Sequence, residues 1–123
     1  METIKAYTDI SQSKKLAEIL PLESADMLYW MGEYITHSYM EGQHKDEQIP
    51  IWSLAALISV LPKEVEIDGQ RYAPCLFPIQ DKWLLKLWYN SNHTITSPIA
   101  IFCDNLIDAC VEMIFKLKEK NLL

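Results

Sequence analysis

The chain has 123 residues, of which half are hydrophobic, and a formal net charge of −6. This composition excludes a disordered protein, and the length suits one domain whose core needs no disulfide or metal to hold it. We therefore expect a single domain over residues 1–123.

The negative charge is concentrated in one quarter of the chain. Residues 23–48 contain six acidic residues and one basic residue, a net −5 of the total −6. Phosphate backbones and anionic membrane surfaces attract Lys and Arg, so this balance disfavours both nucleic acid and membrane as partners.

The three cysteines, Cys75, Cys103 and Cys110, form no CxxC pair, and the first ten residues lack the apolar core of a signal peptide. Both features are typical of reduced thiols in the cytoplasm. We expect a cytoplasmic protein.

A first helix is predicted near the N-terminus. Asp9 or Ser11 can cap it, and helical apolar spacing continues to about Leu20. Pro21 ends the helix because the residue before a proline avoids helical geometry.

Two strands are predicted next, near Asp26–Trp30 and Tyr34–Ser38, with a turn between them. Large apolar groups lie on both faces of this pair, so we expect helices or a partner to cover part of each face. The polar segment Met40–Gln48 is predicted as a loop.

The stretch IPIWSLAALISVLP (Ile49–Pro62) has no charged residue. Ser53 is a good N-cap, and the apolar residues that follow recur at helical spacing up to Leu61. A bilayer span needs about 20 apolar residues, and this run is shorter and contains two prolines. We expect a buried core helix. Its Leu61-Pro62 end repeats that of Leu20-Pro21, which we interpret as a shared helix stop rather than a duplication.

A hairpin and two longer strands are predicted after Pro62. Asp68-Gly69 is a favoured two-residue hairpin turn. The first longer strand, Cys75–Ile79, contains a proline and follows another, so we expect an edge or irregular strand. The second, Trp83–Tyr89, alternates, and its predicted core-facing residues are Trp83, Leu85, Leu87 and Tyr89.

The last helix is the clearest element. Asp104 or Asn105 can cap it, and lysines gather near its C-terminus, where they complement the helix dipole. Its apolar stripe consists of Ile107, Cys110, Val111, Ile114 and Leu117. The predicted order is α-β-β-α-β-β-α, an α+β fold with an antiparallel sheet of about four strands packed with three helices.

His37, Glu41 and His44 would share one face of a helix, and two histidines with a carboxylate are a valid metal-ligand set. The spacing is not HExxH, and the segment reads as a polar loop. We therefore expect no metal and no cofactor.

Cys103 is the best nucleophile available. It precedes the predicted cap of the last helix, where backbone amides would lower its pKa, and His93 lies in the preceding loop. No catalytic motif surrounds the pair, so we expect no catalytic residue, and a small cysteine hydrolase remains an alternative. Cys110, on the apolar stripe, is interpreted as a core residue.

Aromatic residues are abundant, at 13 of 123. Aromatic side chains are enriched at the centres of protein interfaces. We select Trp30, Tyr34, Tyr39 and Trp88 as candidate interface residues, for a protein partner or for a second copy in a homodimer.

The stretches LPLESADMLYW, IPIWSLAALISVLP and DACVEMIFKLKEKNLL resemble a group of short bacterial proteins, without an established activity, that are associated with prophages and other mobile elements of gut bacteria. In many members Asn-Pro precedes the last helix, whereas Leu106 follows Asn105 here. The resemblance implies a mobile-element origin and no particular chemistry.

These observations predict a non-enzymatic accessory protein of a phage or mobile element that acts through protein–protein contacts. A second hypothesis is an acidic inhibitor that mimics nucleic acid, with Glu41, Asp46 and Glu47 in its acidic surface.

Overall fold

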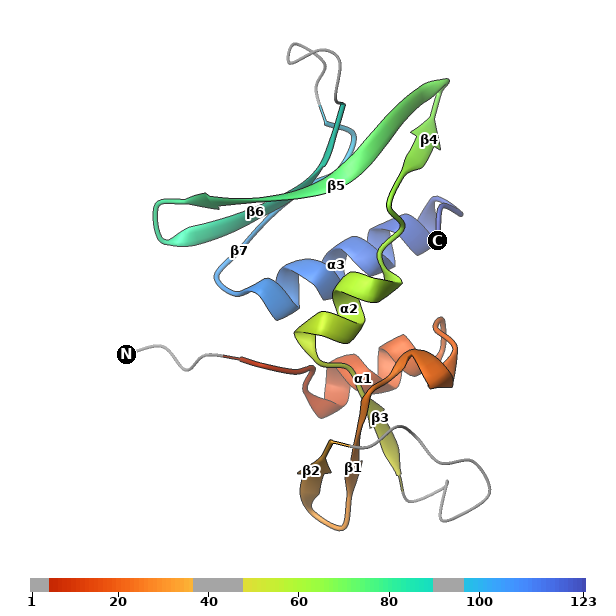
Figure 1. The fold of residues 1–123 in the computed structure, drawn as a ribbon, viewed down its shortest axis with the longest axis vertical. Coiled ribbons are helices and arrows are strands. Elements are labelled where there is room, and N and C mark those ends of the chain that lie inside the picture. The colour runs from red at the N-terminus through yellow and green to blue at the C-terminus, as the bar shows by residue number, and fades with distance from the viewer. Residues whose placement is uncertain (1–4, 37–47, 90–96) are drawn as a thin grey trace. The chain divides into compact units, whose positions relative to one another are not determined.

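The structure, a computed structural model of the chain, describes residues 5–36, 48–89 and 97–123. The chain divides into two compact units, Met1–Val60 and Leu61–Leu123. Each unit combines helix with antiparallel sheet (Figure 1), which confirms the α+β class. That the two units together make the single domain expected from the chain length stays a prediction.

The described part of the first unit has a three-stranded antiparallel sheet in the order β2-β1-β3. Its strands are β1 (Met27–Trp30), β2 (Glu33–Ile35) and β3 (Ile49–Ile51). Its helices are α1 (Ile10–Ala17), the short 3-10 helix η1 (Leu22–Ser24) and α2 (Leu54–Val60). Helix α1 packs against β3, a strand that the sequence had not indicated. Because β3 is an edge strand, it tolerates Pro50.

Two predicted caps are present in this unit. The Asp9 carboxylate accepts the Gln12 N–H at 2.7 Å, and the Gln12 side chain accepts the Asp9 N–H at 3.1 Å, which makes a capping box at α1. At α2, Ser53 Oγ accepts the Ala56 N–H at 3.2 Å. Both helices therefore begin where short polar side chains can satisfy free backbone amides.

The prediction that α2 is buried nearly all round is wrong. Only Ala56 and Leu57 are buried in this helix, and the Ile58 side chain is 52% exposed. The apolar spacing correctly indicated a helix, but burial depends on which faces other elements cover, and that information is not in the spacing.

The second unit has a four-stranded antiparallel sheet in the order β4-β5-β6-β7, followed by a long helix. Its strands are β4 (Val65–Ile67), β5 (Gln70–Ile79), β6 (Lys82–Trp88) and β7 (Ala100–Cys103), and the helix is α3 (Leu106–Glu119). A sheet of four antiparallel strands is present as predicted, but its members differ from those expected: the strands near Asp26–Trp30 and Tyr34–Ser38 belong to the first sheet, and β7 was not predicted.

The turn between β4 and β5 has the predicted geometry. Asp68 and Gly69 have φ angles of 51° and 81°, the left-handed pair that a type I′ hairpin turn requires. Strand β4 pairs only with Gln70–Tyr72, so the rest of β5 has β6 on one side alone. Pro74 and Pro78 both lie in that part, which confirms the predicted edge character.

Helix α3 packs against β6 and β7. Asn105 caps it by accepting the Asp108 N–H at 2.8 Å. All five residues of the predicted stripe are buried, together with Leu85, Leu87 and Ile101 of the sheet. This layer of one helix on one sheet face is the core of the second unit, and Cys110 belongs to it as predicted.

Candidate interaction surface

The strand register separates the two faces of the second sheet. Leu85 lies opposite Ile101 of β7, and both are buried with α3. Leu84, the next residue along, lies between Phe77 of β5 and Phe102 of β7. Directly opposed residues share a face, and successive residues alternate, so the Leu84 row belongs to the face away from the Leu85 row.

We call this the outer face, and it is formed by Phe77, Leu84, Lys86, Trp88 and Phe102. The Phe102 side chain is 60% exposed, the largest exposure of an aromatic residue among those described. The outer face thus presents aromatic surface that no described element buries completely.

A lysine is held over two of these rings. Lys86 Nζ lies 4.6 Å from the centre of the Trp88 ring and 5.4 Å from that of Phe77. The two rings are 5.2 Å apart and inclined by 40°. Each such cation–π contact at an exposed site contributes about 0.5–1 kcal/mol. The arrangement therefore keeps one ammonium group in place, surrounded by apolar surface.

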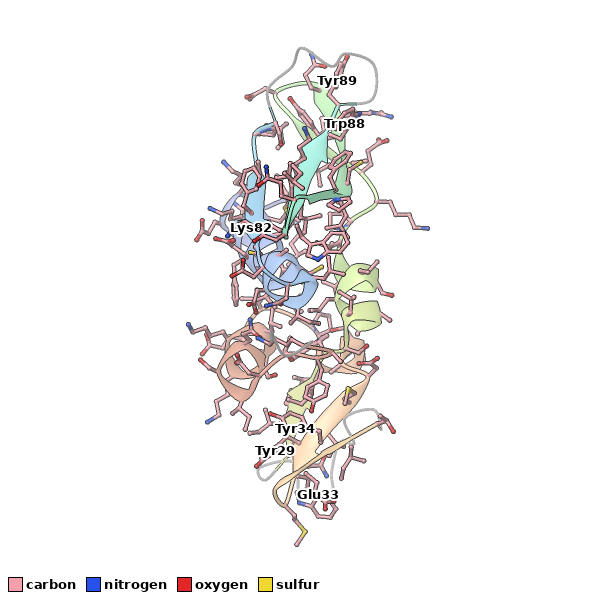
Figure 2. The ribbon with its side chains drawn as sticks, turned by 90° about the vertical axis from the view of Figure 1, so that its left-hand side faces the viewer. Tyr29, Glu33, Tyr34, Lys82, Trp88 and Tyr89 are labelled. Atoms are coloured by element: carbon pink, nitrogen blue, oxygen red, sulfur yellow. The ribbon has the colours of Figure 1, made fainter. Side chains whose placement is uncertain are left out.

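A second aromatic cluster lies on the first sheet. Tyr29 and Tyr34 are cross-strand neighbours with ring centres 4.9 Å apart, and Tyr7 lies 4.5 Å from Tyr34. Figure 2 shows Tyr29 and Tyr34 together near the β1–β2 hairpin. Loss of surrounding water, and then the neighbouring Tyr7 and Tyr29, raise the pKa of the Tyr34 hydroxyl. Tyr34 nevertheless keeps 38% of its surface exposed.

The structure describes three of the four selected aromatic residues, Trp30, Tyr34 and Trp88. Trp30 follows Tyr29 in β1, so it lies on the opposite face of the hairpin from Tyr34. Trp88 belongs to the second unit, and Figure 2 shows it on β6 near Tyr89. Tyr39 lies outside the described residues.

Sequence reasoning missed the partners of Trp88 on the outer face. Lys86 shares a face with Trp88 by alternation along β6, but Phe77 reaches Trp88 only through the pairing of β5 with β6, and Phe102 joins the same face only through the pairing of β7 with β6. The register between β5 and β6 depends on a two-residue turn at Gln80-Asp81, where Gln80 has a φ of 55°. Gln is not a residue that signals such a turn, so the pairing could not be read from the chain.

A shallow open pocket of about 340 Å³ lies beside the β4–β5 hairpin. Arg71, Tyr72 and Tyr89 line it, and Arg71 forms an ion pair of 3.4 Å with Glu64. Both charged side chains are more than half exposed, and such surface pairs contribute at most about 1 kcal/mol. The pocket offers no nucleophile with an adjacent base, so we assign it no catalytic role.

The expectation that helix amides lower the pKa of Cys103 is wrong. Partial burial, and then the carboxylate of Glu112, raise that pKa to about 11. The Cys103 thiol donates a 3.7 Å hydrogen bond to Glu112, which stabilises the protonated form. His93 lies outside the described residues. Burial also raises the pKa of Cys110 to about 11, so neither thiol is prepared for nucleophilic attack at neutral pH.

The predicted ligand set of His37, Glu41 and His44 lies outside the described residues, as do Asp46 and Glu47. Across residues 5–36, 48–89 and 97–123, no group of three or more His, Cys, Asp or Glu side chains is arranged to hold a metal ion.

No described helix is long and apolar enough to cross a membrane. Comparison with known proteins found no match among family models, curated proteins or solved structures.

Proposed function

We propose that this protein acts by binding another protein, and that the outer face of the second sheet is its contact surface. The observation that carries the proposal is the Phe77–Lys86–Trp88 cluster on the same face as the exposed Phe102, with Leu84 between Phe77 and Phe102. Aromatic anchors dominate binding energy at interfaces, and here they lie on a rigid sheet rather than on a loop.

The chemistry of this surface favours a partner with a carboxylate set among apolar groups. Lys86 supplies one cation within aromatic surface, whereas a surface for nucleic acid needs several cations along a groove. Two other cations of this unit are already paired, Lys82 with Asp104 at 3.1 Å and Arg71 with Glu64. The overall charge of −6 further disfavours a polyanion.

From the sequence resemblance we further propose an origin as an accessory protein of a phage or mobile element. The lack of a catalytic motif in the sequence supports action without catalysis, and the three cysteines without a CxxC pair support a cytoplasmic location. The identity of the bound protein would then come from the mobile element or from its host.

Site-specific photo-crosslinking in the source cell tests the contact surface. A photoreactive phenylalanine analogue at position 102 is expected to give a discrete heterologous adduct, and Lys86→Glu is expected to reduce that adduct at least fivefold. The same analogue at Ile58, which is exposed on α2, is the positional control, and Lys120→Glu on the end of α3 is the charge control.

An absent heterologous adduct at position 102, or the same adduct at position 58, overturns the proposal. Circular dichroism of each variant verifies that the sheet and helices persist. An adduct with twice the mass of the chain reports self-association and does not count as support.

A further inference from the structure

Strand β7 is an edge strand whose sequence has no proline or charged residue to prevent pairing with another strand. It ends the order β4-β5-β6-β7, and no strand among the described residues pairs with its outer side. Natural edges are blocked by prolines or charged residues. Proline or an acidic residue occurs in the other edge segments: Glu33 in β2, Pro50 in β3, Glu66 in β4, and Pro74 and Pro78 in β5. The β7 sequence Ala-Ile-Phe-Cys contains neither.

One hydrogen bond determines which backbone groups of β7 point outward. The Leu87 N–H donates to the Ile99 carbonyl at 3.0 Å, so these two residues form a hydrogen-bonded pair. Such pairs alternate along antiparallel strands. By the observed register, Ile101 and Cys103 therefore bond to β6, while the N–H and C=O groups of Ala100 and Phe102 face away from it.

We propose that β7 pairs in antiparallel fashion with β7 of a second copy of this chain, around a twofold axis at Ile101. In this register Ala100 of one copy lies opposite Phe102 of the other. Their four outward N–H and C=O groups then satisfy one another on both sides of the axis. The two four-stranded sheets become one continuous sheet.

The side chains favour the same register. On the outer face, the exposed Phe102 of each copy lies beside the small, exposed Ala100 of the other. On the inner face, the buried Ile101 residues of the two copies become neighbours at the axis. A large group opposite a small one at both ends makes the edge complementary to itself, and this is the reason for choosing a second copy over an unrelated strand.

The predicted contact is small. Four residues of backbone and two phenylalanine rings cover far less than the roughly 1,200–2,000 Å² of a stable interface. We therefore expect a weak dimer with a Kd on the order of 10–100 µM, visible only at high protein concentration. This pairing shares Phe102 with the outer face but needs neither Lys86 nor Trp88, so a variant at Lys86 distinguishes it from the heterologous contact proposed there.

Sedimentation velocity of the full chain, from about 5 µM to 1 mM, tests this proposal. The mass of the wild-type protein is expected to rise from 14.3 kDa toward twice that value. Ala100→Pro removes an outward N–H that β6 does not use, and we expect it to remain at 14.3 kDa throughout. Phe102→Lys is expected to weaken dimerisation at least tenfold, which covers the case in which the proline variant fails to fold.

Ile79→Ser, which removes a similarly exposed apolar side chain away from β7, is the matched control and should dimerise like the wild type. Lys86→Glu should also dimerise, which separates this proposal from the outer-face contact.

Amide hydrogen exchange supplies a residue-level readout. Exchange at Ala100 and Phe102 should slow with concentration, while exchange at Ile101 and Cys103 should not. A monomer at 1 mM, or a dimer that persists in Ala100→Pro and in Phe102→Lys, overturns the proposal.

Discussion

Thr8 and Trp52 exchange two hydrogen bonds although 44 positions separate them: the Thr8 N–H donates to the Trp52 carbonyl at 2.9 Å, and the Trp52 N–H donates to Thr8 Oγ1 at 3.2 Å. The Ser13 hydroxyl donates to the Asp9 carbonyl at 2.6 Å, so the Thr8 hydroxyl is the donor in its 2.7 Å bond to Ser13 Oγ. Thr8, Ser13 and Trp52 are completely buried. This chain of donors joins the N-terminal segment, α1 and the start of α2.

Replacing the Thr8 hydroxyl tests the importance of this network. Thr8→Val preserves shape but leaves the Trp52 N–H without its acceptor and Ser13 Oγ without the Thr8 donor, so we expect the free energy of unfolding to fall by about 2–4 kcal/mol. Thr8→Ser keeps the hydroxyl and should cost about half of that or less. Urea denaturation followed by tryptophan fluorescence measures both variants. Equal losses for Val and Ser would show that the hydrogen bonds are not the cause.

Two adjacent residues of α2 should respond very differently to truncation. Leu57 is fully buried and Ile58 is 52% exposed. We expect Leu57→Ala to lower the free energy of unfolding by about 2–5 kcal/mol, and Ile58→Ala to lower it by less than about 1 kcal/mol. Thermal denaturation of the pair compares them directly. Similar losses would mean that Ile58 is covered in solution, as the sequence alone predicts.

The β1–β2 turn is open to stabilisation. Met31 has a φ of 52° and is 79% exposed, so it bears backbone strain without gaining burial. Asn tolerates this conformation, and Asn-Gly is the preferred type I′ pair, so Met31→Asn should raise the free energy of unfolding by about 0.5–1 kcal/mol. The converse change, Asp68→Met in the β4–β5 turn, should lower it by a similar amount. If neither the urea midpoint nor the Tm rises in Met31→Asn, this account is contradicted.

The Cys103 thiol should react slowly. Its pKa of about 11, against an ordinary 9.0, leaves about 100-fold less thiolate at pH 8. The greater nucleophilicity of a more basic thiolate recovers roughly tenfold, so alkylation by iodoacetamide should be about tenfold slower than for a free cysteine. Peptide-resolved mass spectrometry across pH 7–11 measures this rate. Glu112→Gln should increase the alkylation rate at pH 8, whereas Glu119→Gln on the same helix should leave that rate unchanged. If the rate changes in neither variant, the Glu112 carboxylate is excluded as a cause.

Stability should also depend on pH in the alkaline range. Cys103 and Cys110 both have a pKa raised to about 11 in the folded chain, so folding favours their protonated forms. Their contribution is complete below about pH 9 and is lost as the pH rises from 9 to 11, because the unfolded chain releases these protons first. Urea denaturation should give a lower free energy of unfolding at pH 10.5 than at pH 8. In Cys110→Ala the difference between the two pH values should be smaller.

The local signals in the chain identified most of the regular elements. Capping residues, apolar spacing and the Asp68-Gly69 turn act over a few neighbouring residues, and the helices and the β4–β5 hairpin appeared where these signals lie. Strands β3 and β7 were missed because each is a short apolar segment that becomes a strand only through a partner distant in the sequence.

The sequence by itself determined the α+β class, the start of each helix and the buried stripe of α3, since capping residues and periodicity act within one element. The end of α1 was less well determined: the helix stops at Ala17, before the Leu20 that Pro21 indicated. The tertiary structure decided the rest. Pairing between strands brought Phe77 and Phe102 to the face of Lys86 and Trp88, and it left β7 at the edge of its sheet. The packing around α2 left Ile58 exposed. Register and coverage are relations between segments, and a linear pattern of side chains does not contain them.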